Sequence, residues 1–209
     1  MLSDSEVDSY LTASPQPWKD VATIMLGTGF RPGEVFSLRW ESILLEEGGG
    51  WLRITKGKSK AARRMLPMMS EVYGVIRKRF ENQGMPTEGW VFCSAAKCGH
   101  YNQGTAKKHH AKALRDSKMK PFQPYTLRHT ALTNLGKRCD PFTLAKIAGH
   151  SSITMTERYV HPQSDAIERA FASVTEENGR TLPKVVTAGG HRENREKEVK
   201  YLEAVNVEV

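Results

Sequence analysis

The sequence predicts a mainly α-helical fold that carries one small three-stranded antiparallel sheet, an α+β arrangement. Two observations lead to it. Apolar residues recur at helical spacing in several segments, whereas residues 42–68 hold three short β-rich runs separated by turns. A hydrophobic content of 39% over 209 residues provides a core for one ordinary domain plus an extension.

The first segments are expected to be helical. Residues 3–12 and 17–26 predict two helices, and a Gly-Thr-Gly run at 27–29 ends the second. Residues 32–38 predict a third helix, because Pro32 suits a first helical turn and apolar residues follow three apart. Arg31 would then lie at the mouth of that helix.

The strands are expected at residues 43–45, 51–55 and 65–68. Three consecutive glycines separate the first two strands, and a lysine-rich turn separates the second from the third. After the sheet, residues 71–80 predict a helix, residues 90–92 a short buried segment, and residues 105–117 a basic helix.

The last compact part is expected to hold three helices. Thr126 can cap the first of them, and an Asp-Pro pair at 140–141 is an N-cap followed by proline at the first helical position. Ser151 or Ser152 would cap the last helix, which carries Tyr159. Pro162 closes this part of the chain.

Charge and composition narrow the class of protein. The chain has 31 Lys and Arg against 23 Asp and Glu, a formal charge of +8, which favours a polyanionic partner such as nucleic acid. No stretch approaches the roughly 20 apolar residues of a membrane span, and three cysteines are too few for a disulfide framework. A cytoplasmic protein with free thiols and no membrane association is therefore expected.

Four local motifs stand out in order along the chain. They are TGFRPGEVFSLRW at 28–40, PYTLRHT at 124–130, AGHSS at 148–152 and ERYVH at 157–161. Each alone is weak, but their order and spacing together resemble the catalytic domain of the tyrosine recombinase (phage integrase) family. The resemblance runs from roughly residue 18 to 162. It implies the DNA breaking-rejoining fold and cleavage of DNA through a covalent 3′-phosphotyrosine, without metal, ATP or any other cofactor.

The resemblance assigns a role to each motif residue. Arg31 and Arg128 would hold the scissile phosphate, because a guanidinium is a planar, permanently charged fork that binds phosphate oxygens bidentately. Tyr159 would attack phosphorus, and His150 would hydrogen-bond the phosphate or orient the phenol. Glu34, one helical step beyond Arg31, would fix the orientation of a clamp or of nearby backbone, although an exposed first-turn glutamate is equally compatible with the pattern.

The family keeps its catalytic lysine in the turn between the second and third strands. The family's spacing, counted back from Pro67, implies Lys58 as the proton donor for the leaving 5′-oxygen, with Lys56 as the reserve choice. Most members of the family have a histidine three residues before the second arginine, where this chain has Tyr125. A tyrosine with a pKa of about 10 is a poor proton acceptor, although its hydroxyl can donate to a phosphate oxygen. His129 directly follows Arg128 and is expected to point elsewhere on the helix.

Further contacts to the DNA backbone are expected from two acid-poor stretches, residues 53–64 and 107–115. The candidates within them are Arg53, Lys56, Lys60, Arg63, Arg64, Lys107, Lys108 and Lys112. A solvated charged face is the ordinary alternative for both stretches. The cysteines and histidines between residues 93 and 110 lack the close paired spacing of a zinc site, so no metal is expected.

These patterns predict a catalytic domain at 1–164 and a C-terminal tail at 165–209 that docks on a partner or is partly disordered. Only a short helix precedes residue 18, so an excised piece or a naturally shortened protein is expected, with weak DNA binding by itself. The expected partner is double-stranded DNA. The protein would be a monomer without DNA and a tetramer in the synaptic complex.

Three functions remain open. The first is site-specific recombination, by integration or excision, in a phage or mobile element. The second is nicking and closing related to type IB topoisomerases, and the third is a catalytically silent DNA-binding relative. The complete residue set argues against the third, and the nine-residue spacing from His150 to Tyr159 is more typical of recombinases than of topoisomerases.

Overall fold

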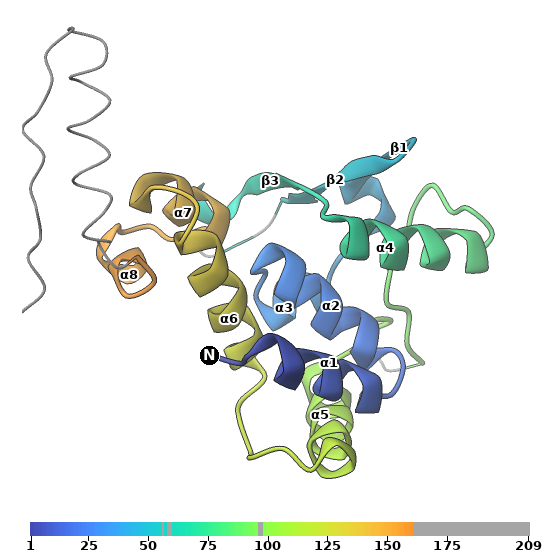
Figure 1. The fold of residues 1–209 in the computed structure, drawn as a ribbon. Helices are drawn as coiled ribbons and strands as arrows, with labels where there is room; N and C mark the ends of the chain where they lie inside the picture. Colours follow the sequence, from blue (N-terminus) through green and yellow to red (C-terminus); the bar gives the residue numbers. More distant parts are fainter. Residues whose placement is uncertain (56, 58–59, 96–97, 161–209) are drawn as a thin grey trace, which may run out of the picture. The chain divides into compact units, whose positions relative to one another are not determined.

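The structure is a computed structural model that describes residues 1–55, 57, 60–95 and 98–160, except for the side chain of Lys60 (Figure 1). The predicted tail at 165–209 therefore lies outside the described residues. Within the described part of the chain, no helix combines the length and the apolar character needed to cross a membrane.

Eight α-helices and three strands make up this part of the chain. The helices are α1 (Asp4–Ala13), α2 (Trp18–Thr28), α3 (Pro32–Phe36), α4 (Ser70–Asn82), α5 (Gln103–Ser117), α6 (Tyr125–Gly136), α7 (Pro141–Ala148) and α8 (Thr154–Glu157). The strands are β1 (Ile43–Glu46), β2 (Gly49–Ile54) and β3 (Arg64–Pro67), and short 3-10 turns lie at η1 (Trp40–Ser42) and η2 (Lys60–Ala62).

The three strands form one antiparallel sheet in the order β1-β2-β3. Leu52 of β2 pairs with Ile43 on one side and with Leu66 on the other. Leu52 and Leu66 are buried, whereas their neighbours Trp51 and Met65 face solvent, as the two-residue period of a strand requires. The predicted mainly helical fold with a small antiparallel sheet is thus confirmed.

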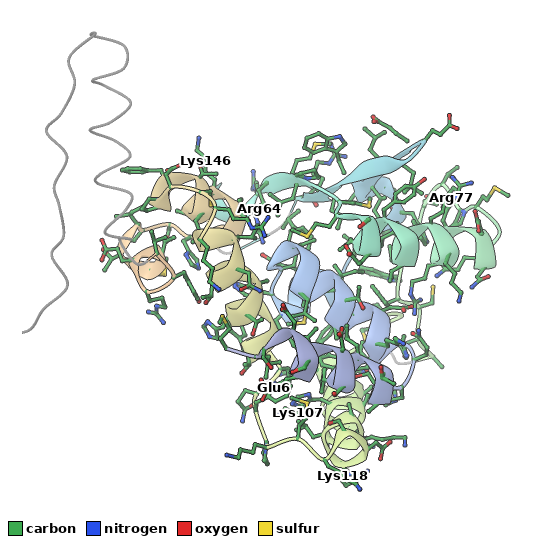
Figure 2. The ribbon with its side chains drawn as sticks, viewed as in Figure 1. Glu6, Arg64, Arg77, Lys107, Lys118 and Lys146 are labelled. Atoms are coloured by element: carbon green, nitrogen blue, oxygen red, sulfur yellow. The ribbon has the colours of Figure 1, made fainter. Side chains whose placement is uncertain are left out.

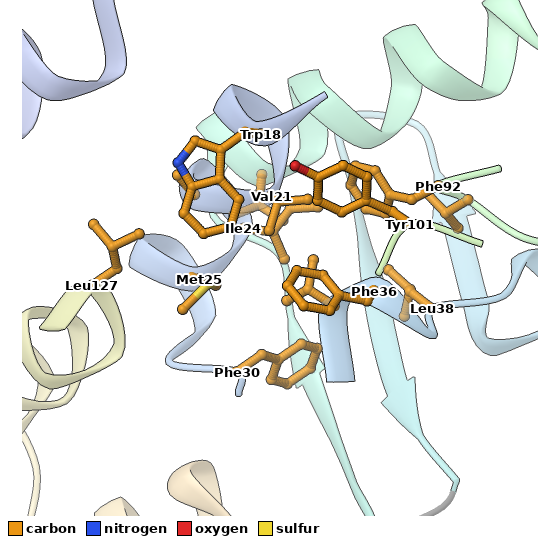
Figure 3. Close-up of a cluster of buried hydrophobic side chains, with 14 of the residues drawn as sticks. Trp18, Val21, Ile24, Met25, Phe30, Phe36, Leu38, Phe92, Tyr101 and Leu127 are labelled. Carbon is orange, nitrogen blue, oxygen red and sulfur yellow. The ribbon is translucent and has the colours of Figure 1, made fainter. Parts of the chain in front are cut away.

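The main core is built around α2. Trp18, Val21, Ile24 and Met25 of this helix are fully buried, and Figure 3 shows aromatic and aliphatic side chains from the loops, α3 and α6 packed about them. Figure 1 shows α2 between α4 and α6, and it packs against both of them. This central helix ends immediately before the first arginine motif.

The helix ends differ in part from the expectation. The Asp140 cap forms as predicted, since its carboxylate accepts hydrogen bonds from the backbone N–H of Phe142 at 2.8 Å and of Thr143 at 3.0 Å. The predicted Thr126 cap is wrong, because α6 begins at Tyr125 and already includes Thr126, and it has no side-chain cap. Because α6 starts at Tyr125, this residue lies on the same face of the helix as the residue four positions later.

The last helix is shorter than expected. α8 ends at Glu157, so Tyr159 lies in the turn just after it. Ser152 accepts a 3.3 Å hydrogen bond from the backbone of Thr154, although the cap position itself is Ile153. Tyr159, only 6% exposed, packs with Leu132 of α6 and Leu144 of α7 in a second small core. The Tyr159 ring is thereby held against α6.

Candidate active site

Arg31 and Glu34 lie at the start of α3. The backbone N–H of Arg31 donates to Glu34 Oε2 at 2.8 Å, and its guanidinium Nη1 donates to Glu34 Oε1 at 3.1 Å. Nη2 of Arg31 reaches the carbonyl oxygen of Gly149, 118 residues away in sequence, at 3.2 Å. Arg31 keeps part of its side chain exposed, at 32%, so a ligand can approach it.

Glu34 also binds Arg64 of β3 through both carboxylate oxygens. Nη1 of Arg64 donates to Oε1 at 3.0 Å and Nη2 donates to Oε2 at 2.8 Å, a bidentate geometry. Burial alone would raise the pKa of Glu34, but the hydrogen bonds and charge of Arg64, followed by those of Arg31, hold it below its usual value. The carboxylate therefore stays ionised between two arginines.

Arg64 was expected to contact DNA, and the structure corrects this. Its side chain is only 6% exposed, Nε donates to the carbonyl oxygen of Ile147 at 2.7 Å, and Nη1 also donates to that of Ala62 at 2.8 Å. Figure 2 labels Arg64 at the α7 end of the sheet. With four of its five N–H groups bonded to the protein and its side chain buried, Arg64 is not placed to bind a DNA phosphate, and it joins β3 to α3 and α7.

Arg128 is completely buried, at 0% exposure. Its guanidinium donates to the carbonyl oxygens of Gly29 at 2.5 Å and Ala148 at 2.7 Å, while its buried Nε has no hydrogen-bond partner within the described structure. Burial, and then the charge of Arg31, lower the pKa of Arg128 to about 10, so it is still a cation at neutral pH. None of its described hydrogen-bond partners is a carboxylate.

His150 follows the end of α7 and contacts Arg128 directly. Nη2 of Arg128 can only donate, so Nε2 of His150 accepts this 3.0 Å hydrogen bond. The neutral ring then carries its proton on Nδ1, which donates to Thr156 Oγ1 at 2.9 Å. Burial, followed by the charges of Arg128 and Arg31, lowers the pKa of His150 to about 4, in agreement with a neutral ring.

Tyr159 lies between two imidazoles. Its hydroxyl is 2.6 Å from Nδ1 of His129, and its ring stacks on His129 and on His150, with centroid distances of 5.6 and 6.2 Å. Burial raises the pKa of Tyr159, while the charge of Arg128 acts in the opposite direction. The nucleophile expected from the sequence is therefore protonated in the free protein and hydrogen-bonded to a histidine.

The contact with His129 contradicts the expectation that this residue points away from the site. Residues four apart on a helix share a face, and α6 includes both Tyr125 and His129, whose rings lie 5.4 Å apart. His129 therefore lies one turn along from the position where the family has its histidine. The four-residue spacing from Tyr125 was the sequence signal that could have identified it.

A cleft of about 1420 Å³ opens beside Arg31 and Tyr125. Its lining includes Arg31, Tyr125 and Gly149, and further cations at Arg39, Arg53 and Lys107. Glu34 is the one carboxylate among the described residues that line it. A concave, positively charged surface thus leads to the exposed side of the Arg31 guanidinium.

The other predicted DNA contacts are distributed unevenly. Arg53 and Lys107 line the cleft, and Figure 2 labels Lys107 on α5. Arg63 and Lys108 are exposed, and the exposed Lys112 forms an ion pair with Asp116 at 2.6 Å. Sequence reasoning missed Arg39, which lines the cleft and stacks over Trp90.

The lysine predicted as the proton donor cannot be placed. Lys58 and the reserve choice Lys56 lie outside the described residues, as does the side chain of Lys60. Gly57, which the structure describes, lines the cleft. Among the described residues, no group of three or more histidine, cysteine or acidic side chains is arranged to hold a metal ion.

Known proteins resemble this chain in sequence and in fold. The integrase of Salmonella phage P22 is 23% identical over 209 residues, which cover 93% of this chain and 51% of the relative. The recombinase XerH, solved in a pre-cleavage complex with its difH substrate, gives a TM-score of 0.65 at 21% identity, covering 85% of this chain and 54% of XerH. This chain therefore spans about half the length of these relatives.

One solved structure matches over nearly its whole length. The catalytic domain of bacteriophage HP1 integrase gives a TM-score of 0.61 at 22% identity, covering 87% of this chain and 98% of that domain. The fold is thus that of a tyrosine recombinase catalytic domain. Residues 2–166 also match the sequence profile of the phage integrase family. With the motif residues gathered at one site and most of the chain matched, this protein belongs to the phage integrase family of tyrosine recombinases.

Proposed function

We propose that this protein cleaves and rejoins double-stranded DNA through a phosphodiester link to Tyr159, as the catalytic domain of a site-specific recombinase. One observation carries the proposal: Arg128 is a fully buried cation whose described hydrogen-bond partners include no carboxylate. A buried charge is costly without an opposite charge. A DNA phosphate that reaches Arg128 after local rearrangement would supply that charge and take up the free Nε–H.

Arg31 is the second half of the proposed phosphate clamp. Its guanidinium is partly exposed to the cleft, and Glu34 accepts one hydrogen bond from this guanidinium and one from the backbone N–H of Arg31. Two guanidinium groups that face the same phosphate stabilise the charge that grows on its non-bridging oxygens in the transition state. Arg53 and Lys107 would hold neighbouring phosphates along the cleft.

The cleavage step conserves the energy of the DNA backbone bond. The Tyr159 oxygen forms a bond to phosphorus, and the bond from phosphorus to the 5′-oxygen breaks. The phenol loses one proton, and the leaving 5′-oxygen gains one from a lysine ammonium of the β2–β3 turn, for which Lys58 is the candidate. Rejoining is the same exchange with a 5′-hydroxyl as the attacking group, so the balance requires neither metal nor ATP.

The proposed partner is duplex DNA, and the proposed active assembly is a tetramer that brings two sites together, with a monomer in the absence of DNA. The solved XerH structures are complexes with its own difH substrate before and after cleavage. The charged cleft of the present chain supports a similar mode of contact. Contacts of this kind weaken as salt rises, because they depend on displacing counterions from DNA.

A covalent-adduct assay tests the proposal. The full chain is incubated with a pool of nicked duplexes of randomised sequence, in EDTA and without ATP, and adducts are resolved on a denaturing gel. We expect a protein–DNA adduct that is absent in Tyr159→Phe. The matched control is Tyr73→Phe, since Tyr73 of α4 donates its hydroxyl to the carbonyl oxygen of Glu46 and lies outside the site.

The outcomes separate the proposed function from its rivals. An adduct that persists in Tyr159→Phe, or that requires Mg²⁺, would overturn the proposal. Relaxation of supercoiled plasmid without strand exchange would assign a topoisomerase-like reaction instead. DNA binding with no adduct on any member of the pool would assign a silent DNA-binding protein.

A further inference from the structure

The hydroxyl of Tyr159 has one described hydrogen-bond partner, Nδ1 of His129 at 2.6 Å. The second imidazole next to the phenol is not available to accept its proton. Nε2 of His150 already accepts from Arg128, and its Nδ1 contacts Thr156. Among the described side chains around this phenol, His129 is therefore the group in position to take its proton.

The position of His129 is fixed by the helix that also carries Arg128. Because the two residues are adjacent on α6, the same helix places one cation at the proposed phosphate and one imidazole at the nucleophile. The turn after α8 holds Tyr159 in place through a hydrogen bond from its backbone N–H to Thr156 and through packing on Leu132. The contact between His129 and Tyr159 therefore joins two packed segments, α6 and the turn after α8, and neither side chain is exposed.

The charges around His129 favour a neutral ring. From the segment after α8 it faces Tyr159 and Arg158, and from α6 it faces Arg128 and Tyr125. The N-terminal amino group is also near, because the backbone N–H of Leu2 donates a hydrogen bond to Thr130 of α6. Burial, and then the charges of Arg128 and Arg158, lower the pKa of His129. A neutral imidazole with hydrogen on Nε2 leaves Nδ1 free to accept.

We propose that His129 is a catalytic residue that accepts the Tyr159 proton through Nδ1 as the phenolic oxygen attacks phosphorus. The proposal rests on the function proposed above. In the forward step, the bond from the Tyr159 oxygen to phosphorus forms, the bond to the 5′-oxygen breaks, and the phenolic proton moves to His129 Nδ1. The 5′-oxygen takes its proton from the turn lysine, and in the rejoining step His129 returns its proton to the phenol.

The geometry also explains why the phenol does not ionise before DNA binds. The pKa of Tyr159 is raised by burial and that of His129 is lowered, so transfer of the proton in the free protein is unfavourable. Attack on a phosphate held by Arg31 and Arg128 removes this obstacle, because the negative charge of the oxygen passes into the new bond as the proton leaves. Proton transfer is thus coupled to the attack.

The test compares two histidines that each contact a tyrosine hydroxyl through Nδ1. His129→Asn keeps an amide oxygen near the position of Nδ1, so it can accept a hydrogen bond but cannot take a proton. The matched control is His109→Asn on α5, which makes the same change at the 2.8 Å contact between Nδ1 of His109 and the hydroxyl of Tyr101, outside the site. Rates of adduct formation are measured across pH 5 to 9 on the nicked duplex pool.

We expect His129→Asn to slow adduct formation roughly 100-fold or more, the usual loss when a general base is removed. In the wild type, the rate should rise with pH through a pKa below the usual 6.5 of histidine, and this rise should disappear in His129→Asn. His109→Asn should retain the wild-type rate and pH profile. Adduct formation that is unchanged or faster in His129→Asn would overturn the proposal. A faster rate would show that the contact with His129 restrains Tyr159.

A second substrate separates the two proton transfers. When a sulfur atom replaces the 5′-oxygen, the leaving group no longer needs a proton. The His129→Asn defect should persist on this substrate, whereas a Lys58→Ala defect should be relieved. Relief of the His129→Asn defect would overturn the proposal, because it would place His129 at the leaving group.

A measurement without DNA keeps the inference separate from the proposed function. In the uniformly ¹⁵N-labelled full chain, the His129 ring should show hydrogen on Nε2 and an unprotonated Nδ1, and Tyr159→Phe should change the Nδ1 resonance. A ring with hydrogen on Nδ1 would overturn the inference. If the ring is as expected but the wild type forms no adduct, the failure lies in the proposed function.

Discussion

Replacing Arg64 by methionine removes the buried cation that neutralises Glu34. The two side chains are 6% and 11% exposed and are joined by two hydrogen bonds of 2.8 and 3.0 Å. Methionine fills a similar volume but leaves the carboxylate without its bidentate partner. We therefore expect a loss of stability that comes from an uncompensated charge and not from a cavity.

The expected magnitude follows from the remaining partners of Glu34. Removing one member of a buried ion pair costs about 3 to 5 kcal/mol. Arg31 still donates two hydrogen bonds to the carboxylate, so the lower end, about 3 kcal/mol, is expected. For a chain of this length, that loss lowers Tm by about 6 to 12 °C.

The assay is thermal and urea unfolding of Arg64→Met against a matched control. In the control, Arg39→Met breaks the exposed pair of Arg39 with Glu41, whose side chains are each 41% exposed, and should cost little stability because solvent screens such a pair. Adding Glu34→Gln to Arg64→Met should restore part of the loss, because the double variant no longer buries an unpaired charge.

The pH dependence gives an independent check. In the wild type, the pKa of Glu34 is held below its unfolded value, so its contribution to stability is complete above the unfolded pKa and is lost as pH falls through the folded one. In Arg64→Met the buried carboxyl has a higher pKa, and its protonation relieves the penalty. The difference between wild type and variant should therefore narrow on acidification. A loss no larger than that of Arg39→Met, or a difference that widens at low pH, would refute the reasoning.

Three other predictions concern the site. A Cβ on Gly136 would collide with the carbonyl oxygen of Tyr159, so Gly136→Ala should displace Tyr159 and slow adduct formation while changing Tm only slightly. An unchanged rate of adduct formation would contradict this prediction. Arg128→Met should abolish the adduct without lowering Tm, since it removes a buried cation, and a drop of several degrees would show that Arg128 is needed for folding. The pKa of His150 lies near 4 in the folded protein and near 6.5 when unfolded, so stability should fall as pH drops through this window. The change of unfolding free energy with pH should be smaller in His150→Gln than in the wild type. Equal changes in the two proteins, measured by unfolding at several pH values, would contradict this prediction.

Local patterns in the sequence determined the order and type of the elements. Helical spacing of apolar residues predicted α2, short β-rich runs separated by turns predicted the three-stranded sheet, and the Asp140 cap marked the start of α7. These signals depend on neighbours within a few residues, so one sequence is enough to detect them. The four motifs also located Arg31, Arg128, His150 and Tyr159, which the fold brings together at one site.

Tertiary packing decided which partner each of these groups has. Arg64 looked like one more cation in a basic stretch, yet the docking of β3 on α7 brings it within hydrogen-bond distance of a carboxylate 30 residues earlier. His129 meets Tyr159 only because the segment after α8 folds back onto α6. Sequence spacing fixes which residues share a face of one helix, but the partner across an interface depends on how two elements dock. The docking of β3 and of the Tyr159 segment therefore required the three-dimensional structure.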